Sequence, residues 1–440
     1  MDVRGRFYKL LAYGFSICFI FQVFLTIGGV TKFIPSTGVT LPLISYGGSS
    51  VASTLIIFAV MQGIHDNYGI MLPGIVARSG LDYASVSFVI AVGHILYGAT
   101  QPVFGMLAIK KSNAFVMLLG IILMAIGLIV SPFCNSLWSL LLFFGILLPA
   151  GTGALCFGIV MGALAPIIGE KKAAVASGIV QASAGIGDAI MSPLLQQLTD
   201  SFGVTLSMPV FSIPILLMLP IVFWLGGKKK RIDKAQYVEA TEETNDKKEK
   251  LSDILMSAFH DRTYWCLLIG FSTCGFHMSI IETHLFSQYV GSGIPANFAS
   301  LTLTVYGIFT MLGSVITGFL GQKFRMKNVL AGVYGIRILI ALAFIFIPKS
   351  VPFAFVATGM LGLTGDSTVP PTTGIISNKV GVAKMAVVYG SIFIGHQLGA
   401  FASAWLGGIL VSTTLGYTAL WIVDLCLCMT ATIASFKIRD

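Results

Sequence analysis

The sequence predicts an all-α integral membrane protein, and three observations support this fold class. Of the 440 residues, 56% are hydrophobic and only 10% are charged, a balance typical of chains that lie in lipid. Apolar runs of about 20 residues recur along the chain, and each is long enough to cross a bilayer core of about 30 Å as a helix. A charged segment near the middle of the chain interrupts this series of runs.

The apolar runs predict thirteen membrane spans. Helices are expected because a single chain segment in lipid can satisfy its backbone hydrogen bonds only as a helix. If residues 7–30 span the membrane, Arg4, Arg6 and Lys9 are left outside, against the positive-inside rule. The expected limits are 7–30, 52–76, 83–108, 113–131, 138–166, 173–197, 206–226, 264–288, 297–321, 328–347, 351–376, 383–411 and 415–436.

Basic side chains predict which loops face the cytoplasm. They gather in alternate loops, whereas the intervening loops carry only Arg78 and Lys349. The loops rich in Lys and Arg, and the C-terminus with them, are therefore expected to be cytoplasmic. Topology thus explains the net charge of +9, and no nucleic-acid partner is expected. The clustered residues are Lys110 and Lys111, Lys171 and Lys172, Lys228 to Arg231, Lys323, Arg325 and Lys327, Lys379 and Lys384, and Lys437 and Arg439.

The charged segment predicts how the chain is divided. Residues 228–250, "KKKRIDKAQYVEATEETNDKKEK", are too polar to bury a core. We interpret residues 227–262 as a cytoplasmic linker between two six-helix halves, 52–226 and 263–440, with residues 1–51 as a separate N-terminal part. Two such halves around a midplane site are typical of secondary transporters.

Residues from about 58 to 440 resemble the major facilitator superfamily, in particular the branch of monocarboxylate transporters and oxalate/formate antiporters. The stretch "DSTVPPTTGIISNKVGVAKMAVVYGSIFIGHQLGAFASAWLGGIL", residues 366–410, is similar to the tenth and eleventh helices of that branch. Residues 274–290, "CGFHMSIIETHLFSQYV", are similar to its seventh helix. The resemblance implies twelve helices and solute transport by alternating access, without covalent catalysis.

Two short loops, "GMLAIKKSN" and "GFLGQKFRMK", resemble the cytoplasmic gating loops of the superfamily. The first loop has Ile109, and the second has Gln322, where the superfamily usually has an acid. The gate is therefore expected to work differently or weakly. The gating positions that follow the family pattern are Gly105, Lys110, Gly318 and Lys323.

The first 64 residues resemble a different family, the SEDS cell-wall proteins to which FtsW and RodA belong. Residues 34–64, "IPSTGVTLPLISYGGSSVASTLIIFAVMQGI", are similar to that family's last loop and last helix. The match covers about one seventh of the chain and lacks the loop with the catalytic acid, so a glycan polymerase is not expected. Because the two families would run this helix in opposite directions, residues 43–74 indicate a seam between two genes.

Polar groups inside the spans are the candidate transport residues, because a charged side chain at mid-bilayer costs a few kcal/mol or more. For each of them, a cavity-lining or proton-linked role competes with plain hydrogen bonding between helices. The substrate or proton pathway is expected to include His65, Asp66, Tyr68, Gln181, Asp188, His277, Glu282, His284, Tyr306, Asp366, Thr368, Tyr389, His396 and Gln397.

Spacing groups several of these residues. His277 and His284 are seven residues apart, nearly two turns of α-helix, so both rings are expected to face one cavity, with Glu282 well round the helix from them. The same spacing puts two further pairs on one face each, Gln181 with Asp188 and Tyr389 with His396.

Two prolines predict a break in the tenth helix. Pro370 and Pro371 lack backbone donors and follow closely after Asp366 and Thr368. Discontinuous helices often expose backbone groups at the binding sites of transporters.

A carboxylate substrate would be expected to meet a buried Arg or Lys, and the spans offer only Arg337. The ninth helix is usually peripheral in the superfamily, so we expect Arg337 to form a buried ion pair with an acid. Asp424 is expected to be a packing group. Histidine, hydroxyl and backbone donors would then have to bind the anion.

These inferences predict a multi-pass secondary transporter of the inner membrane that moves a small organic solute, with a carboxylate as the favoured class, driven by protons or by exchange. The alternative is a membrane component whose residues 1–50 dock to the division or cell-wall machinery. No cofactor or metal is expected, because the six histidines are dispersed, without pairs three to five residues apart.

Overall fold

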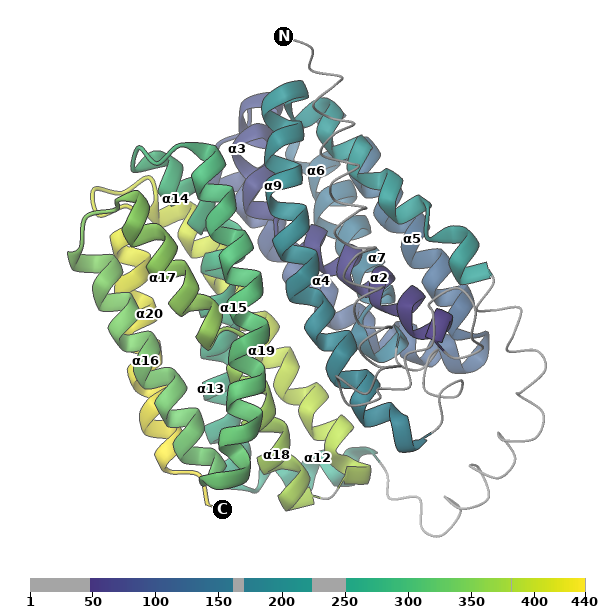
Figure 1. Cartoon of the computed structure of the whole chain (residues 1–440), viewed down its shortest axis with the longest axis vertical. Helices are drawn as coiled ribbons and strands as arrows, with labels where there is room; N and C mark the ends of the chain where they lie inside the picture. The colour runs from purple at the N-terminus through teal and green to yellow at the C-terminus, as the bar shows by residue number, and fades with distance from the viewer. Residues whose placement is uncertain (1–47, 161–169, 224–250, 381, 440) are drawn as a thin grey trace, which may run out of the picture.

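The computed structural model describes residues 48–160, 170–223, 251–380 and 382–439, and these residues form helices and connecting turns, with no strand among them. The all-α fold class is therefore confirmed. The helices form two bundles that lie side by side, α2 to α9 in one and α13 to α20 in the other (Figure 1). The predicted span 7–30 and the charged segment 228–250 lie outside the described residues.

The first bundle contains two interrupted spans and one helix that covers two spans. A bend of 46° separates the end of α2 from α3. The helix α9 turns at Gly203, whose positive φ of 67° is a conformation that glycine adopts without steric cost. The elements are α2 (Gly48–His65), α3 (Tyr68–Ser79), α4 (Tyr83–Lys110), α5 (Asn113–Val130), η1 (Ser131–Phe133), α6 (Leu137–Leu140), the π-helix η2 (Leu141–Leu147), α7 (Leu148–Ala154) and α9 (Glu170–Leu216).

The second bundle also contains two interrupted spans. A π-helix lies within the seventh span, and a short 3₁₀ turn breaks the tenth. The elements are α12 (Leu251–Phe259), α13 (Arg262–Ser279), the π-helix η3 (Ile280–Leu285), α14 (Phe286–Gly291), α15 (Ala296–Lys323), α16 (Met326–Phe346), α17 (Val351–Thr364), η4 (Asp366–Thr368), α18 (Val369–Val380), α19 (Val382–Leu410) and α20 (Tyr417–Phe436).

The helices agree with the spans predicted from residue 52 onward. Nine helices of the described part are long and apolar enough to cross a membrane, and the bent pair α2 and α3 makes a tenth span. One of the nine, Ala182–Phe223, turns at Gly203 and so covers two predicted spans. The remaining predicted span is the broken series α17, η4 and α18.

The end of the predicted linker is helical. Residues 251–259 form α12, although the sequence assigns them to a charged connection. Apolar residues at positions 251, 254, 255, 258 and 259 recur at helical spacing, so one face of this short helix can pack against the bundle. Its neighbours are α13 and α19.

Three helix contacts join the two bundles. The helix α4 packs against α19, α9 packs against α15, and α3 packs against η3 and α14. Small residues allow the backbones to approach closely, since a Cβ atom added to Gly307 of α15 would lie 2.5 Å from the carbonyl oxygen of Gly185 in α9. The bundles therefore touch along packed helix pairs.

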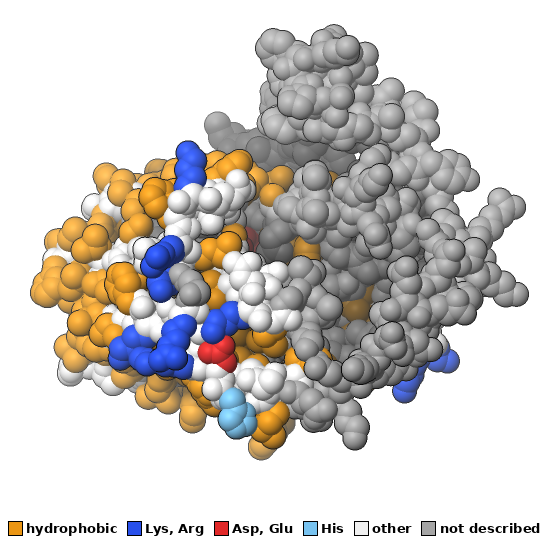
Figure 2. Space-filling model, turned by 90° about the horizontal axis from the view of Figure 1, so that it is seen from below, with side chains coloured by type: hydrophobic (Ala, Val, Ile, Leu, Met, Phe, Trp, Pro, Cys, Tyr) orange, Lys and Arg blue, Asp and Glu red, His pale blue; other side chains and the backbone are white. Residues whose placement is uncertain are grey.

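Basic side chains gather at the end of the molecule that holds the C-terminus. Figure 2 shows this face from below, with Lys and Arg around the ends of the second bundle. The exposed basic residues there are Arg262, Lys323, Arg325, Lys379, Lys437 and Arg439. This face is the one that the positive-inside rule places in the cytoplasm.

Candidate functional site

The candidate site lies where three spans leave α-helical geometry. The first break is the turn of Asp66 and Asn67 between α2 and α3, where Asn67 has φ −108° and ψ 19°. The π-helix η3 carries Glu282, and the 3₁₀ turn η4 begins at Asp366. Breaks of this kind free backbone groups and turn side chains to new directions, and they are frequent at functional sites.

Asp66 is the centre of a group of acids. Its carboxylate accepts two hydrogen bonds from Gln62 Nε2, at 2.9 and 3.0 Å, and its Oδ1 lies 2.8 Å from His65 Nδ1. Ligand atoms of His65, Asp66 and Glu282 all lie within 4.8 Å of one another. Asp188 of α9 lies close enough to Asp66 and Glu282 for their charges to act on it.

We call Asp66, Asp188 and Glu282 the acidic cluster. It joins the two bundles, because Asp66 and Asp188 belong to the first and Glu282 to the second. Asp188 is 5% exposed and its Oδ1 has no hydrogen-bond partner. No Lys or Arg of the described residues forms an ion pair with the cluster, and His65, 2.8 Å from Asp66, is the basic side chain in contact with it.

Aromatic and histidine rings surround His65. The ring centroid of His65 lies 5.2 Å from that of Tyr68, 4.6 Å from Tyr97 and 6.0 Å from His94. His94 Nε2 lies 3.3 Å from Ser279 Oγ of α13 and so connects the bundles a second time. Sequence reasoning missed His94 and Tyr97, although a lone histidine within an apolar span was a signal that could have identified this position.

The expectation that His277 and His284 face one cavity is wrong. His277 Nδ1 bonds to Asp424 Oδ2 of α20 at 2.8 Å, whereas His284 bonds to α4 and α19. His277 belongs to α13, whereas His284 lies inside the π-helix η3, whose wider turn points side chains in other directions than an α-helix would. The same turn brings Glu282 to the acidic cluster, and Asp424 is a hydrogen-bond acceptor as well as a packing group.

His284 belongs to a network at the end of the molecule opposite the C-terminus. Its Nδ1 lies 3.0 Å from the hydroxyl of Tyr83, which lies 3.3 Å from the hydroxyl of Tyr417. His284 Nε2 bonds to the carbonyl oxygen of Ala404 at 3.0 Å. We call Tyr83, His284 and Tyr417 the outer latch, because Tyr83 starts α4 of the first bundle and the other two belong to the second.

Arg337 supports the break in the tenth span. Its Nη2 donates to the carbonyl oxygens of Thr364 at 2.5 Å and Gly365 at 2.8 Å, and it lies 3.4 Å from Cys274 Sγ. The ion pair predicted for Arg337 is not found among the described residues. The guanidinium instead satisfies carbonyls that the break in the helix leaves without partners.

The prolines of the tenth span lie directly after the break, where they remove no hydrogen bond from the helix. Pro370 and Pro371 occupy the first turn of α18, in which backbone donors have no partner within the helix. Directly before them, Thr368 Oγ1 lies 3.2 Å from Cys274 Sγ of α13. The expected discontinuity beside Asp366 is present in the structure as η4.

The remaining candidates on α15 and α19 have mixed surroundings. The rings of Tyr389 and His396 both pack against Phe271, at 5.5 and 5.1 Å, which fits their expected common face. Gln397 packs against α4, because a Cβ atom on Gly98 would lie 2.5 Å from its Cγ. The hydroxyl of Tyr306 donates to Met278 Sδ at 3.2 Å.

Five candidates take no part in these contacts. The side chain of Gln181 lies outside the described residues, and its expected common face with Asp188 stays a prediction. An added Cβ atom at Gly105 or Gly318 would meet nothing within 4 Å. Lys110 and Lys323 are exposed at the ends of α4 and α15. The gating role of these loops stays a prediction.

Two groups of side chains among the described residues have ligand atoms close enough for a metal ion, His65 with Asp66 and Glu282, and His277 with Asp424 and Cys428. The spacing argument missed both groups, because their members come from different helices. In each group the histidine nitrogen is already bonded to the aspartate, so an ion would have to displace that hydrogen bond.

Comparisons with known proteins agree with this fold. Residues 43–348 match the family described as Major Facilitator Superfamily, and residues 1–68 match a family described as Cell cycle protein. The matches overlap at residues 43–68, within the predicted seam. Both resemblances seen in the sequence are therefore confirmed.

The similar proteins also fall into two groups, one that matches most of the chain and one that matches only a short stretch. Monocarboxylate transporter 12 of Xenopus laevis is 23% identical, over 78% of this chain and 78% of its own length. Peptidoglycan glycosyltransferase RodA of Mycobacterium tuberculosis is 48% identical over 61 residues. That match covers 14% of this chain and only 13% of the glycosyltransferase.

Solved structures share the fold at low identity. The nucleoside transporter NupG superposes with a TM-score of 0.69 at 13% identity, over 90% of this chain and 99% of its own. The D-xylose-proton symporter also has a TM-score of 0.69, at 12% identity, over 90% and 98% of the two chains. These similarities show the fold alone.

Proposed function

Since the chain belongs to the major facilitator superfamily, we propose that it is a secondary transporter that moves a small organic solute by alternating access, coupled to protons. The acidic cluster is the observation that carries the coupling. Three carboxyl groups from both bundles meet here without a Lys or Arg ion pair among the described residues, and like charges this close disfavour ionisation of all three, so we expect the cluster to bind a proton. Glu282 can receive or release a further proton when the two halves move.

The arrangement of contacts supports a cycle with two states. The outer latch and the packing of α3 on η3 hold the bundles together at one end. Transport requires that these contacts break and that the other ends close, with residues 52–226 rocking against 263–440. Because Glu282 and Asp66 lie on opposite bundles, the same motion would change their separation and hence their protonation.

We propose a monocarboxylate as the solute. The similarity to the monocarboxylate transporters supports this class. Arg337 is fully buried and bonded to carbonyl groups, so it is poorly placed to meet a substrate. The anion would instead bind to hydroxyl and imidazole donors near the cluster, such as Tyr97 and His94, and would enter together with a proton that offsets its charge.

We propose the inner membrane as the location, with the C-terminus in the cytoplasm. The gathering of Lys and Arg on the face that holds the C-terminus supports this orientation (Figure 2). Glycosyltransferase activity is not proposed, because the similarity to RodA covers only 13% of that enzyme.

The test is uptake by proteoliposomes that contain the purified chain. Radiolabelled lactate, pyruvate, formate and oxalate are offered with and without an inside-alkaline pH gradient, and an enclosed pH dye reports proton entry. We expect one of these anions to accumulate only with the gradient, and proton entry to follow anion entry. Glu282→Gln should abolish gradient-driven uptake.

The matched control is Asp82→Asn, which neutralises an exposed acid at the start of α4. Asn caps a helix about as well as Asp, so this variant should fold and transport normally. Anion uptake that is indifferent to the gradient, or equal uptake by Glu282→Gln and the unchanged chain, would contradict the proton coupling. Failure of lactate, pyruvate and formate, or uptake of the dicarboxylate oxalate alone, would contradict the monocarboxylate assignment.

A further inference from the structure

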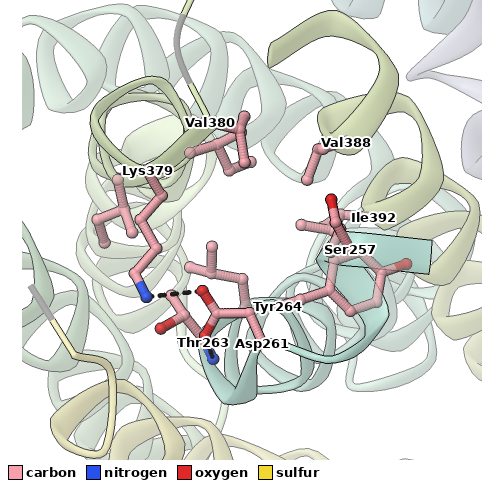
Figure 3. A pocket seen from close by; sticks show the side chains of 12 residues that line it. Ser257, Asp261, Thr263, Tyr264, Lys379, Val380, Val388 and Ile392 are labelled. Atoms are coloured by element: carbon pink, nitrogen blue, oxygen red, sulfur yellow. Dashed lines mark hydrogen bonds and ion pairs between the residues drawn. The ribbon is translucent and has the colours of Figure 1, made fainter. Parts of the chain in front are cut away.

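A cavity of about 230 Å³ lies at the cytoplasmic end of the second bundle, apart from the acidic cluster. It is enclosed by α12, the start of α13, the end of α18 and the start of α19, and Figure 3 shows the side chains that surround it. All of its lining residues belong to one bundle. The cavity therefore does not depend on how the two bundles sit relative to each other during transport.

One part of the cavity lining is aliphatic. Seven of its twelve lining residues have aliphatic side chains, whereas the other five carry polar atoms; the aliphatic ones are Ala258, Leu267, Ile375, Ile376, Val380, Val388 and Ile392. A dry, wholly apolar cavity of about 150 Å³ holds a benzene molecule. This one is larger, and it suits the body of a small organic molecule, such as an aliphatic chain of about six carbon atoms.

The rim of the cavity carries an ion pair, and only its acidic member is fixed by a further hydrogen bond. Lys379 Nζ donates to Asp261 Oδ2 at 2.7 Å. Asp261 is also fixed by the amide of Thr263, which donates to its Oδ1 at 2.8 Å as the cap of α13. An ammonium has three N–H donors, so Lys379 can keep this bond and still donate to a second acceptor.

Thr263 supplies a second polar group at the same place. Thr263 is 2% exposed, and its hydroxyl lies beside the carboxylate of Asp261 without forming a hydrogen bond of good geometry. The hydroxyl can therefore donate to an acceptor that enters the cavity. Figure 3 places Thr263 directly beside the end of Lys379.

The charge of this face favours an anion. Asp261 is already engaged by Lys379 and Thr263, whereas exposed Arg262, Lys437 and Arg439 lie on the same face of the molecule. A negatively charged molecule is attracted to such a face, and a cation is repelled.

From these observations we propose that the cavity binds a small apolar monocarboxylate from the cytoplasm, at a site separate from the central one. The carboxylate accepts hydrogen bonds from Lys379 Nζ and Thr263 Oγ1, and the apolar body fills the space between α12 and α19. The ligand thereby joins α13 to α18 at their cytoplasmic ends. This inference does not rest on the proposed transport, because binding can be measured without it.

The experiment is titration calorimetry on the purified full-length chain in detergent, with hexanoate as the probe and hexylammonium as its matched cation. We expect hexanoate to bind and hexylammonium not to bind. Lys379→Gln should weaken hexanoate about 10- to 100-fold, because it removes a charged donor, and Thr263→Val about 2- to 10-fold. Val388→Trp should abolish binding by filling the cavity.

Three further variants make the result specific. Lys437→Gln removes a charge from the same face without touching the cavity and should leave hexanoate affinity unchanged. Asp261→Asn releases Lys379 and should tighten binding. Glu282→Gln disables the proposed central site and should keep this binding, so that a failure of transport is told apart from a failure of this inference.

Several outcomes would overturn the proposal. They are the absence of hexanoate binding at millimolar concentration, equal binding of hexylammonium, and unchanged affinity in both Lys379→Gln and Val388→Trp. The melting temperature of each variant without ligand is measured alongside. A variant that does not fold is replaced by Ile376→Trp, which fills the cavity from α18 and is expected to abolish binding in the same way.

Discussion

Asp66 and Glu282 place carboxyl groups within 4.8 Å of each other across the contact between the two bundles. Each lies at a point where its span departs from α-helical geometry, Asp66 before the bend at Asn67 and Glu282 inside η3. Two acids at this distance repel each other when both are ionised, so the charge on each acts on the other and opposes the contact between the bundles, a coupling of the two acids.

This coupling predicts that the two acids act as a unit. Asp66→Asn and Glu282→Gln are each expected to abolish accumulation against a gradient, and the double variant should be no worse than either single one. Passive exchange of labelled for unlabelled solute should persist in all three. Uptake and exchange in proteoliposomes check this, and independent, additive losses would show that the acids do not share a role.

The outer latch predicts a shift between states. Tyr83→Phe removes the hydroxyl that contacts His284 and Tyr417, a loss of about 1 kcal/mol that would favour separation of the outer ends about fivefold. Hydrogen exchange of the amides at the start of α4 and in α14 should become faster.

The matched control for the latch is Tyr289→Phe. It also removes a buried hydroxyl, which contacts Thr358 Oγ1 at 2.8 Å and the carbonyl oxygen of Ala354 at 3.4 Å, but all of these groups belong to the second bundle. In Tyr289→Phe, the amides at the start of α4 and in α14 should exchange hydrogen at the same rate as in the unchanged chain. Equal acceleration in the two variants would mean that the latch does not hold the bundles together.

Close packing of α3 on η3 predicts a sensitive glycine. A Cβ atom on Gly69 would lie 2.6 Å from the carbonyl oxygen of Glu282, so Gly69→Ala forces the two spans apart at a cost of about 1–3 kcal/mol. We expect a lower melting temperature in detergent and reduced uptake.

Gly105→Ala is the control for this prediction. Nothing lies within 4 Å of the added atom, and alanine favours a helix interior over glycine by about 0.5–1 kcal/mol. Its melting temperature should stay the same or rise, so the comparison with Gly69→Ala is one of stability. A melting temperature of Gly69→Ala equal to that of Gly105→Ala would contradict the close packing of α3 on η3.

Much of the fold could be predicted from the sequence, because the membrane restricts the choices. Spans from residue 52 onward follow from the length of the apolar runs, and the break in the tenth span follows from Pro370 and Pro371, which cannot donate backbone hydrogen bonds. Gly203, where α9 turns, lies between the predicted spans 173–197 and 206–226, and glycine adopts the positive φ of this turn without steric cost.

The site was less predictable, because its parts come together only in the tertiary structure. The sequence identifies Asp66, Asp188 and Glu282 separately, but nothing in their spacing shows that they form one cluster. No sequence pattern marks the π-helix η3. The spacing of His277 and His284 therefore predicts a common face only for a regular α-helix, which this span is not. The contact of Arg337 with carbonyl groups likewise depends on where the tenth span breaks.

The support that Arg337 gives to the tenth span can be tested by stability. Arg337→Met leaves the carbonyls of Thr364 and Gly365 without their donor, at a cost of about 1–3 kcal/mol for each unsatisfied group. We expect a clearly lower melting temperature in detergent for Arg337→Met than for the unchanged chain. Arg337→Lys should melt at a temperature between these two. Arg78→Met, which loses only an exposed bond to Asn135, should change little, and an equal loss in both would contradict this role.

The pair of Asp261 and Lys379 predicts how stability depends on pH. Partial burial alone would raise the pKa of Asp261, but hydrogen bonds from Lys379 and Thr263 outweigh it and hold the pKa below the usual 3.8. A lowered pKa in the folded state means that the pair stabilises the chain above the usual value, and that this contribution is lost as the pH falls through the lowered one. For a pair this exposed the contribution is small, about 0.2–1 kcal/mol.

Melting temperatures of the unchanged chain, Asp261→Asn, Lys379→Gln and the double variant, measured from pH 7 to pH 3, form the test. The unchanged chain should exceed each single variant by a constant margin from pH 7 to pH 5, and the margin should shrink towards pH 3. The double variant should be no less stable than Asp261→Asn, because one partner without the other has nothing to bind. A margin that grows as the pH falls would contradict the sign of the shift.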